Sequence, residues 1–386
     1  MFLEFAWNAW EKRKFKNLVV RVNKTSDNST IPSVEFEDII SKQGRLNKDV
    51  RLKVNSKQGI YFEPQDVLFG KLRPYLQNWL FPSFYGRAVG DFWVLRANSS
   101  LLSEYLFVLI QSPRFQSVAN ISSGTKMPRS DWNTVSNTSF SIPVQSEQRR
   151  IEQLFNVLDD LIAATQDKKK NLKYLRESIV LRLLDQDFNL INDSVPWKES
   201  RLGELVTFRK GRGYSKNELT FSGTPIILYG RLYTNYQVVI DNITDTFVKE
   251  HSDSVKSSGG DVIIPSSGET ATDIARASSI TRPDIILGGD LIVLNFNTNL
   301  INSPFLALSL SSGKRKSYLS RHAQGKSVVH LQNESLASLS LKLPSPDTQA
   351  RIAEIILQID KIIVQYDEKV TLLQRLKKML LQGLFI

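Results

Sequence analysis

Residues that could carry catalysis are few in this chain. The three histidines, His251, His322 and His330, all lie in the second half and have no counterpart in the first. Gly211-Arg212-Gly213 lacks the third glycine of a dinucleotide-binding loop, and Ser312-Gly313-Lys314 lacks the upstream glycine of a phosphate-binding loop. No Asp/Asn-Pro-Pro-aromatic run of an amino-methyltransferase occurs. We therefore predict no catalytic site and no metal site, with the histidines on the surface or in loops.

Basic and aromatic side chains in loop-like segments are what remains for chemistry. Arginine forks can read guanine edges in the major groove of DNA, and lysines mostly neutralise phosphate. A single such residue is more often an ordinary solvated charge, but their accumulation in both halves favours nucleic-acid binding. Because the two sets differ, we expect the halves to prefer different bases. The candidate DNA-binding residues are Lys71, Arg73, Tyr75, Arg87, Lys126, Arg129, Arg209, Lys210, Arg212, Tyr214, Arg231, Arg276, Lys314, Arg315, Lys316, Arg321 and Lys326.

The composition agrees with a folded, basic protein. The 386 residues carry a net charge of +11, and most of the excess falls in residues 1–146 (+7) and 195–343 (+4). A basic surface of this kind points to a polyanion, although mild basicity also serves solubility. The absence of cysteine excludes disulfides and thiolate metal sites. With no run of about 18 apolar residues and no signal-peptide pattern, we expect a cytoplasmic protein that does not span a membrane.

The sequence segments that must position these residues occur twice in the chain, as an internal repeat. The Gly90-Asp91 strand start recurs at Gly289-Asp290, and the Trp10 segment recurs at Trp197. Such repeats have to be recognised before the architecture is inferred. The longest correspondence joins Pro143, Gln148, Ile151 and Asp159 to Pro344, Gln349, Ile352 and Asp360, each 201 positions later.

A long helix is predicted after each of the two prolines, Pro143 and Pro344. Apolar residues there alternate at spacings of three and four, which is the seam of a helix written in heptads. Ser146 is a plausible N-cap of the first helix, and Ser345 or Asp347 of the second. Each helix should run roughly 36 residues, about 54 Å. The predicted helix-pair interface comprises Ile151, Leu154, Leu158, Leu172, Leu175 and Ile179, with Leu161 in the same stripe, and Ile352, Ile355, Ile359, Ile362, Tyr366, Leu373, Leu376 and Leu380.

Short β-rich runs separated by Gly, Asn, Ser and Pro make up the rest of each repeat. We predict an α/β (α+β) fold with a pseudo-twofold repeat: two mixed α/β domains and two long antiparallel coiled-coil helices. The alternative is that the helices are core elements of two independent domains. The predicted boundaries are 1–146 for the first domain, 147–194 for the first helix and linker, 195–343 for the second domain and 344–386 for the second helix.

The pattern resembles the specificity subunits of Type I restriction-modification systems over nearly the whole chain. The most specific elements are the stretches 143–151 and 344–352, which match the family's Pro…Gln-x-x-Ile pattern directly before a long helix. The opening from Trp197 to Val206 and the stretch 259–264 fit the family as well. The first repeat departs from it, with Lys16-Asn17 in place of Gly203-Glu204 and Gln65 in place of Gly260.

This resemblance implies a non-catalytic DNA-recognition subunit. Two target-recognition domains would each read one half of an asymmetric, bipartite sequence in double-stranded DNA, and the helix pair would fix the unread spacer. The expected partners are methyltransferase subunits, two of them, and a translocating restriction subunit in complexes that restrict. The chain itself should bind no cofactor, since S-adenosylmethionine belongs to the methyltransferase. Half-sites one helical turn apart, about 34–36 Å, are within reach of helices of the predicted length.

Two other readings stay open from the sequence alone. A non-enzymatic assembly adaptor would show duplex affinity that is independent of sequence, or none. A self-contained enzyme such as a nuclease would need a duplicated acidic cluster, and the sequence offers none. The recognised bases do not follow from residue types, because readout also depends on loop geometry and DNA shape.

Overall fold

In the computed structural model, which describes residues 10–53, 55–121, 126–185 and 196–385, the chain divides into two units. Unit 1 comprises residues 1–168 and 366–386, and unit 2 comprises residues 169–365. The long helices α4 (Gln145–Asp185) and α11 (Pro346–Leu384) each contribute one part to unit 1 and the other part to unit 2.

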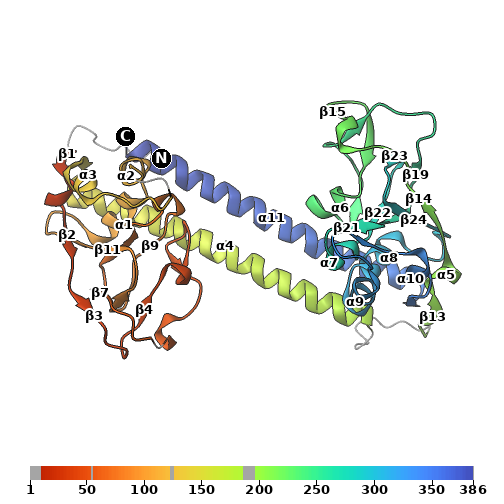
Figure 1. Cartoon of the computed structure of the whole chain (residues 1–386), viewed down its shortest axis with the longest axis horizontal. Coiled ribbons are helices and arrows are strands. Elements are labelled where there is room, and N and C mark those ends of the chain that lie inside the picture. Colours follow the sequence, from red (N-terminus) through yellow and green to blue (C-terminus); the bar gives the residue numbers. More distant parts are fainter. Residues whose placement is uncertain (1–9, 54, 122–125, 186–195, 386) are drawn as a thin grey trace. The chain divides into compact units, whose positions relative to one another are not determined.

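Unit 1 places three short helices and the ends of the long helices around two small sheets. The main sheet has the order β2-β11-β8-β9, the second sheet β3-β7-β10-β4, and the ribbon β1-β12 precedes α4 (Figure 1). The elements are β1 (Glu11–Lys14), β2 (Val19–Val22), β3 (Thr25–Ser26), β4 (Ser33–Val34), β5 (Ile39–Ile40), β6 (Arg45–Leu46), β7 (Gly59–Phe62), β8 (Val67–Gly70), β9 (Trp79–Leu80), β10 (Gly86–Ala88), β11 (Phe92–Ala97), β12 (Ser139–Ile142), α1 (Ser103–Gln111), α2 (Pro113–Ala119) and α3 (Trp132–Asn137).

Unit 2 repeats this plan. Its main sheet is β14-β24-β20-β22-β17, its second sheet β15-β18-β16-β23-β19, and its ribbon β13-β26 precedes α11. The elements are β13 (Lys198–Arg201), α5 (Leu202–Leu205), β14 (Val206–Lys210), β15 (Leu219–Thr220), β16 (Thr224–Ile227), α6 (Arg231–Thr234), β17 (Val239–Ile240), β18 (Phe247–Val248), β19 (Lys256–Ser258), β20 (Asp261–Pro265), β21 (Ser267–Gly268), α7 (Ala271–Ile274), β22 (Ser278–Ile280), β23 (Pro283–Leu287), β24 (Leu291–Phe296), α8 (Ser303–Leu310), α9 (Gly313–His322), β25 (Val329–His330), α10 (Asn333–Ala337) and β26 (Ser340–Leu343).

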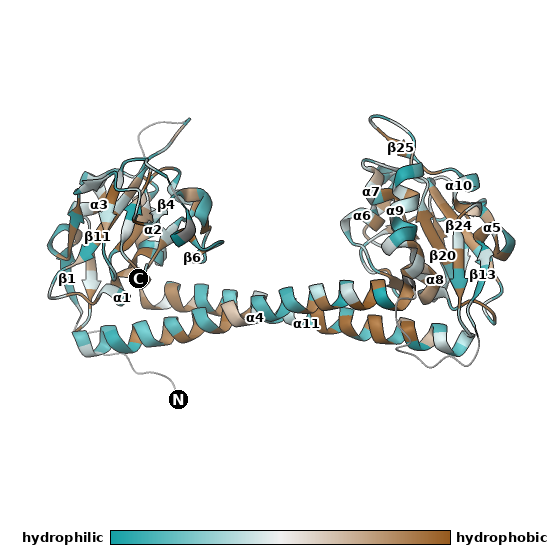
Figure 2. Ribbon diagram, turned by 90° about the horizontal axis from the view of Figure 1, so that it is seen from below, coloured by the Kyte–Doolittle hydropathy of each residue, from teal (hydrophilic) through white to brown (hydrophobic). Residues whose placement is uncertain are grey.

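The central strands are buried on both faces, which explains their continuous apolar sequence. In β11, Trp93 and Leu95 pack into the core that α1 covers, whereas Phe92 and Val94 pack into the core shared with the second sheet. The strands β20 and β24 of unit 2 are correspondingly hydrophobic along most of their length (Figure 2). The register repeats too, because Leu95 lies opposite Val67 and Leu294 lies opposite Val262. The predicted mixed α/β fold with an internal repeat is confirmed.

A buried glutamine fastens each long helix to its sheet unit. Gln148 accepts a hydrogen bond from Leu102 N (2.9 Å) and donates to the carbonyl oxygens of Ser100 (3.1 Å) and Pro143 (2.9 Å). Gln349 likewise accepts from Asn302 N (2.9 Å) and donates to the oxygens of Leu300 and Pro344 (3.0 Å each). Each glutamine is 1% exposed. The repeated Pro…Gln spacing is therefore a structural anchor that sets where each helix leaves its sheet.

The long helices run antiparallel to each other within each unit, and a partly buried ion pair joins them in each. In unit 1, Lys377 Nζ lies 2.5 Å from Asp159 Oδ1. In unit 2, Arg176 Nη2 donates to Asp360 Oδ2 at 2.9 Å. Residues 159 and 360, and residues 176 and 377, are each 201 positions apart, so the duplication has produced the same pair twice. With 41 and 39 residues, both helices exceed the predicted length of about 36.

The predicted seam of the helix pair is wrong at four of its positions. Leu175, Ile355, Ile362 and Leu376 are 51%, 41%, 40% and 43% exposed, and so is Leu161 at 41%. Adjacent apolar residues allow two phases one residue apart, and at these five positions the folded helices use the phase of the following residue. That phase buries Phe155, Ile162, Ile356 and Val370 and brings Arg176 and Lys377 to their partners. The remaining predicted residues are buried or half-buried, namely Ile151, Leu154, Leu158, Leu172, Ile179, Ile352, Ile359, Tyr366, Leu373 and Leu380.

Candidate nucleic-acid interface

In unit 1, three chain segments meet at Asp91, the residue directly before β11. Lys71 N donates to the carbonyl oxygen of Asp91 at 2.8 Å, and Ser130 N donates to the oxygen of Lys71 at 2.9 Å. The carboxylate of Asp91 accepts from Arg129 Nη2 at 2.9 Å and lies 3.4 Å from Lys71 Nζ. The structure therefore brings together the segment after β8 and the segment before α3, which carry four of the predicted basic candidates.

Unit 2 repeats this junction at Asp290 with the same main-chain bonds. Ser266 N donates to the oxygen of Asp290 at 2.8 Å, and Leu331 N donates to the oxygen of Ser266 at 3.0 Å. The strands β21 and β25 pair here, with Ser267 opposite His330, just as Leu72 pairs with Arg129 in unit 1. We call these two places the Asp91 junction (residues 71–73, 91 and 128–130) and the Asp290 junction (residues 266–268, 290 and 329–331).

The side chains at the two junctions differ although the main chains agree. At the Asp290 junction, Ser267 Oγ donates to Asp290 Oδ1 (3.1 Å) and lies 3.0 Å from His330 Nδ1. Two cations surround Asp91 instead. Burial by itself would raise the pKa of Asp91, but the hydrogen bond and charge of Arg129 and the charge of Lys71 lower it below its ordinary value. The first junction is thus an ionic cluster, and the second is a hydrogen-bonded one.

Three predicted DNA-binding arginines are buried and serve the fold, which corrects that part of the prediction. Arg87 is fully buried on β10 and donates to the carbonyl oxygens of Lys57 (2.5 Å) and Asn55 (2.8 Å). Arg231 is 8% exposed and lies 3.2 Å from Asp245, and Arg315 is 9% exposed and donates to the oxygen of Leu184, near the end of α4. The guanidinium groups of Arg87 and Arg315 are used by main-chain carbonyl oxygens, and that of Arg231 pairs with Asp245, so none of the three is presented to DNA.

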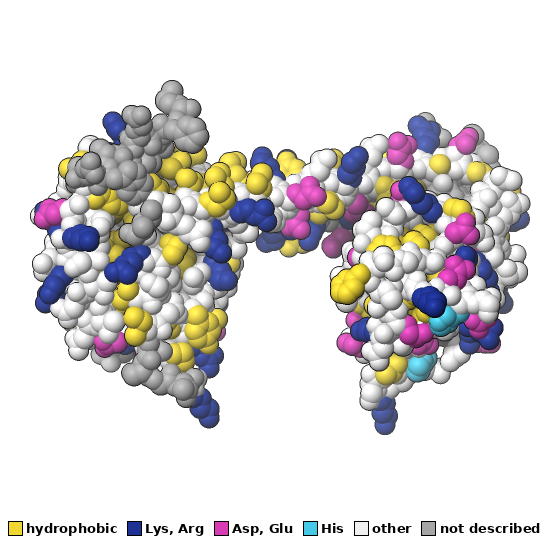
Figure 3. Space-filling view, turned by 90° about the horizontal axis from the view of Figure 1, so that it is seen from above, with side chains coloured by type: hydrophobic (Ala, Val, Ile, Leu, Met, Phe, Trp, Pro, Cys, Tyr) yellow, Lys and Arg dark blue, Asp and Glu magenta, His cyan; other side chains and the backbone are white. Residues whose placement is uncertain are grey.

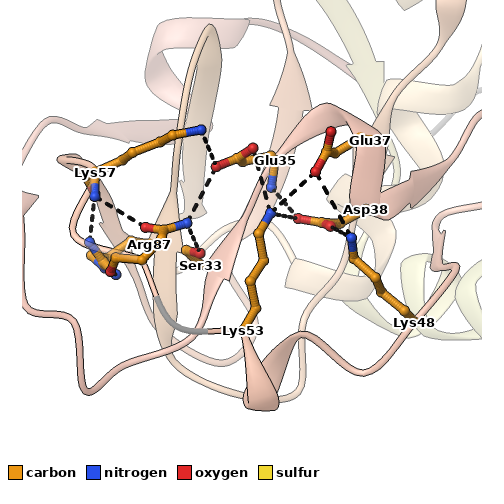
Figure 4. A network of polar contacts seen from close by, with 9 residues as sticks. Ser33, Glu35, Glu37, Asp38, Lys48, Lys53, Lys57 and Arg87 are labelled. Atoms are coloured by element: carbon orange, nitrogen blue, oxygen red, sulfur yellow. Dashed lines mark hydrogen bonds and ion pairs between the residues drawn. The ribbon is translucent and has the colours of Figure 1, made fainter.

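The network around Arg87 also holds a basic loop that the sequence prediction missed. The buried carboxylate of Asp38 lies 2.8 Å from Lys48 Nζ and 2.9 Å from Lys53 Nζ, and Glu35 Oε1 accepts from Lys57 (Figure 4). Burial would raise the pKa of Asp38, but the lysines and the Glu35 main-chain N–H lower it. The run of lysines and arginines over residues 42–57 was its signal in the sequence, although these acidic partners now neutralise much of that charge.

The other candidates lie at least partly at the surface, many of them beside an acid. Arg209 contacts Asp261, Arg212 contacts Asp253, and Arg276 contacts Asp273. Tyr214 bonds Ser254 and stacks on His251. Lys316 is half-buried, and Arg321 bonds the carbonyl oxygen of Ser317. The exposed candidates are Arg73, Tyr75, Lys126 and Arg129 in unit 1, and Lys210, Arg212, Lys314, Arg321 and Lys326 in unit 2.

The surfaces of the two units differ in charge pattern. On the face drawn in Figure 3, the charged side chains of unit 1, at the left, are mainly lysine and arginine. Unit 2, at the right, shows acidic, basic and histidine side chains close together. His251, His322 and His330 are exposed, as predicted. Within the described ranges we find no group of three or more His, Cys, Asp or Glu residues placed to hold a metal ion. No described helix is long and apolar enough to cross a membrane.

Comparisons with known proteins match part of this chain to a known domain family. Residues 194–375 match the model of the Type I restriction modification DNA specificity domain. The specificity subunit of the Type I restriction enzyme MjaVIII from Methanocaldococcus jannaschii is 22% identical over 189 residues, which cover 49% of this chain and 42% of that protein. The match therefore spans less than half of that relative's length.

Two solved structures share the fold over nearly the whole chain. One is the Type I restriction-modification S subunit from M. genitalium, with a TM-score of 0.62 and 16% identity over 98% of this chain and 96% of that one. The other comes from a study of complex assembly and conformational transition in the type I R-M system, with a TM-score of 0.58 and 19% identity over 97% and 96%. Residues 194–375 therefore match a Type I restriction modification DNA specificity domain, and the chain shares its repeated fold over nearly its whole length with these two solved structures.

Proposed function

We propose that this chain reads an asymmetric, bipartite sequence in double-stranded DNA and scaffolds the enzyme subunits that act there. The observation that carries the proposal is the pair of junctions at Asp91 and Asp290. The same main-chain frame is built twice, but it presents an ionic cluster in one unit and a hydrogen-bonded cluster in the other. Two equally built readers with different side chains suit two different half-sites.

Exposed apolar stripes on the long helices support a scaffold role. In unit 1, Val157 and Leu161 of α4 are 67% and 41% exposed, and Leu372, Leu376 and Met379 of α11 are 64%, 43% and 60% exposed. Residues spaced by three, four or seven lie on one face of a helix, so these form stripes rather than isolated side chains. Such stripes are typical of protein interfaces. We propose that methyltransferase subunits, two per chain, dock here, with a restriction subunit joining complexes that cleave DNA.

The chain is proposed to contribute recognition only, and the methyltransferase to supply S-adenosylmethionine and the chemistry. The lengths of α4 and α11 are proposed to set the unread gap between the half-sites. Insertion of one heptad into both helices keeps the phase of their seam and should lengthen the tolerated gap. An unchanged gap in that variant would refute this part of the proposal.

The direct test is to express the chain with a methyltransferase partner in cells that lack such a system and to map methylated adenines across the genome. We expect one two-part motif with a fixed gap, and no methylation when either chain is expressed alone. In parallel, duplexes that contain the mapped motif should bind the purified full chain more tightly than scrambled duplexes at moderate salt. Binding that ignores sequence, or no binding at all, would favour the assembly adaptor instead. Methyl transfer by the chain alone would refute the non-catalytic assignment.

A further inference from the structure

We infer that Arg73 reads a guanine in the half-site bound by unit 1 and that Asp91 is its positioning residue. This inference rests on the proposed function and assigns one base contact within it. Arg73 is an exposed residue of the Asp91 junction, and its position has no cationic counterpart at the Asp290 junction.

The backbone at Arg73 has an unusual conformation that main-chain hydrogen bonds hold on both sides. Arg73 has φ 48°, in the left-handed region that non-glycine residues seldom adopt, and the residue before a proline normally has extended backbone. Its N–H donates to the oxygen of Pro128 at 2.7 Å, and its oxygen accepts from Leu76 N at 2.8 Å. Gln77, with φ 57°, closes the turn, and Pro74 is buried. Residues held in such conformations gather at functional sites, where the surrounding structure enforces them.

The Asp91 junction leaves Arg73 as a free cation. Lys71 and Arg129, its neighbours across the junction, both lie against the carboxylate of Asp91. The guanidinium of Arg73 has no ion-pair or hydrogen-bond partner among the described residues, and the side chain is exposed, as is that of Tyr75 two residues later (54%). Its planar fork can donate two hydrogen bonds to O6 and N7 of guanine, which a point charge such as lysine cannot do equally well.

Asp91 acts through the segment it holds. It bonds Lys71 through its main-chain oxygen and Arg129 through its carboxylate, and Arg129 lies next to Pro128, the acceptor of Arg73 N. The two segments that carry Arg73 and its main-chain acceptor are therefore fixed to one residue. Loss of the carboxylate should loosen the turn without removing any group that contacts DNA.

The Asp290 junction predicts that only one half-site depends on this contact. Ser266 occupies the place of Lys71, so the place of Arg73 falls on Gly268. Gly268 has no side chain, and a Cβ there would lie 2.9 Å from the hydroxyl oxygen of Tyr233. Unit 2 must therefore read its half-site with other residues, which gives every Arg73 variant an internal control.

The test uses the full chain expressed with its methyltransferase partner and genome-wide mapping of methylated adenines. In Arg73→Ala we expect one G·C position of one half-site to become degenerate, with discrimination there falling roughly tenfold or more. The gap and the other half-site should be unchanged. Arg73→Lys should also lose the discrimination, and Asp91→Asn should weaken it partly. The matched control is Arg13→Ala, which removes an arginine of the same unit that lies outside the junction and pairs with Glu11.

Binding measurements separate the outcomes when methylation is weak. Purified variants with unchanged thermal unfolding are titrated with duplexes substituted at each position of the motif. Flattened discrimination at one G·C pair supports the inference. An unchanged motif refutes it, as does a uniform loss of affinity with a salt slope lowered by about one, because that is the signature of a phosphate contact. If the unsubstituted chain directs no two-part motif, the proposed function itself fails, whatever the variants do.

Discussion

The ion pair between Asp159 and Lys377 should contribute measurably to the stability of unit 1. Lys377 Nζ lies 2.5 Å from Asp159 Oδ1 and 2.7 Å from Gln111 Oε1. The side chain of Lys377 is 13% exposed, and that of Asp159 is 31% exposed. Burial raises the pKa of Asp159, the charge of Lys377 opposes that effect, and neighbouring Asp160 adds to it. Lys377→Met therefore leaves a carboxylate that is poorly solvated and beside a like charge.

The expected cost follows from two limits. Breaking a fully buried pair costs about 3–5 kcal/mol, and an exposed pair contributes about 0–1 kcal/mol. Because Asp159 keeps 31% of its side chain in solvent, we expect Lys377→Met to cost about 2 kcal/mol. Asp159→Asn should cost less because the amide can still accept a hydrogen bond, and the double variant should recover about 1 kcal/mol of the sum.

Tryptophan fluorescence during urea unfolding suits this measurement, since Trp197 is the only tryptophan of unit 2 and the others belong to unit 1. Arg13→Met, which replaces a cation by methionine in an exposed ion pair with Glu11, is the control for the loss of a surface pair. Arg176→Met breaks the equivalent pair in unit 2 and should shift the fluorescence transition less than Lys377→Met does. A coupling energy below about 0.5 kcal/mol, or a Lys377→Met cost no larger than that of Arg13→Met, would refute the reasoning.

Three further predictions concern the anchor, the repeat and the acid response. Gln148→Ala removes three hydrogen bonds of a buried side chain and should cost about 2–4 kcal/mol in urea unfolding, whereas Gln145→Ala, which removes one exposed bond, should cost under about 1 kcal/mol. Gln65 has φ 73° at the position where the second repeat has Gly260. Gln65→Gly should therefore raise the free energy of unfolding by about 1 kcal/mol and the melting temperature with it. Because the pKa of Asp38 is lowered in the folded state, its ionised carboxylate stabilises the fold at pH values above the ordinary pKa of 3.8. This stabilisation is lost as the pH falls through the folded-state pKa. Asp38→Asn should therefore be less stable than the unsubstituted chain at pH 7 and should lose less stability on acidification.

The strands and helices that carry the fold could be predicted because their signals are local and redundant. Apolar runs such as Phe92–Leu95 require burial on both faces, and the heptads after Pro143 require a partner helix. The phase of the seam could not be predicted, since Leu154 precedes Phe155 and Leu161 precedes Ile162, and either choice keeps the spacing. The folded phase is distinguished by long-range pairs such as that of Arg176 with Asp360, which no local pattern contains.

The candidate site was predictable in type but not residue by residue. Loops rich in cations were a sound expectation, yet Arg87 and Arg315 prove to bond carbonyl oxygens that lie about 30 and over 100 residues away in sequence. An arginine's role depends on which acceptors the fold leaves buried, and that is tertiary information. Asp91 and Asp290 were visible as a repeated Gly-Asp strand start, but their place as the centre of a three-segment junction emerges only once the loops are folded.

The distribution of the repeated bonds between main chain and side chain explains how one frame can carry two different sets of side chains. At both junctions the carbonyl oxygen of the aspartate accepts a main-chain hydrogen bond at 2.8 Å, which any residue except proline can donate. Side chains at those positions are therefore free to change from Lys71 and Arg129 to Ser266 and His330 without disturbing the frame. The helices are the opposite case, because Gln148 and Gln349 use their side chains and cannot vary in the same way. The two repeats thus differ in the side chains of the junctions, where bases would be read, and agree in the glutamine side chains that anchor the helices.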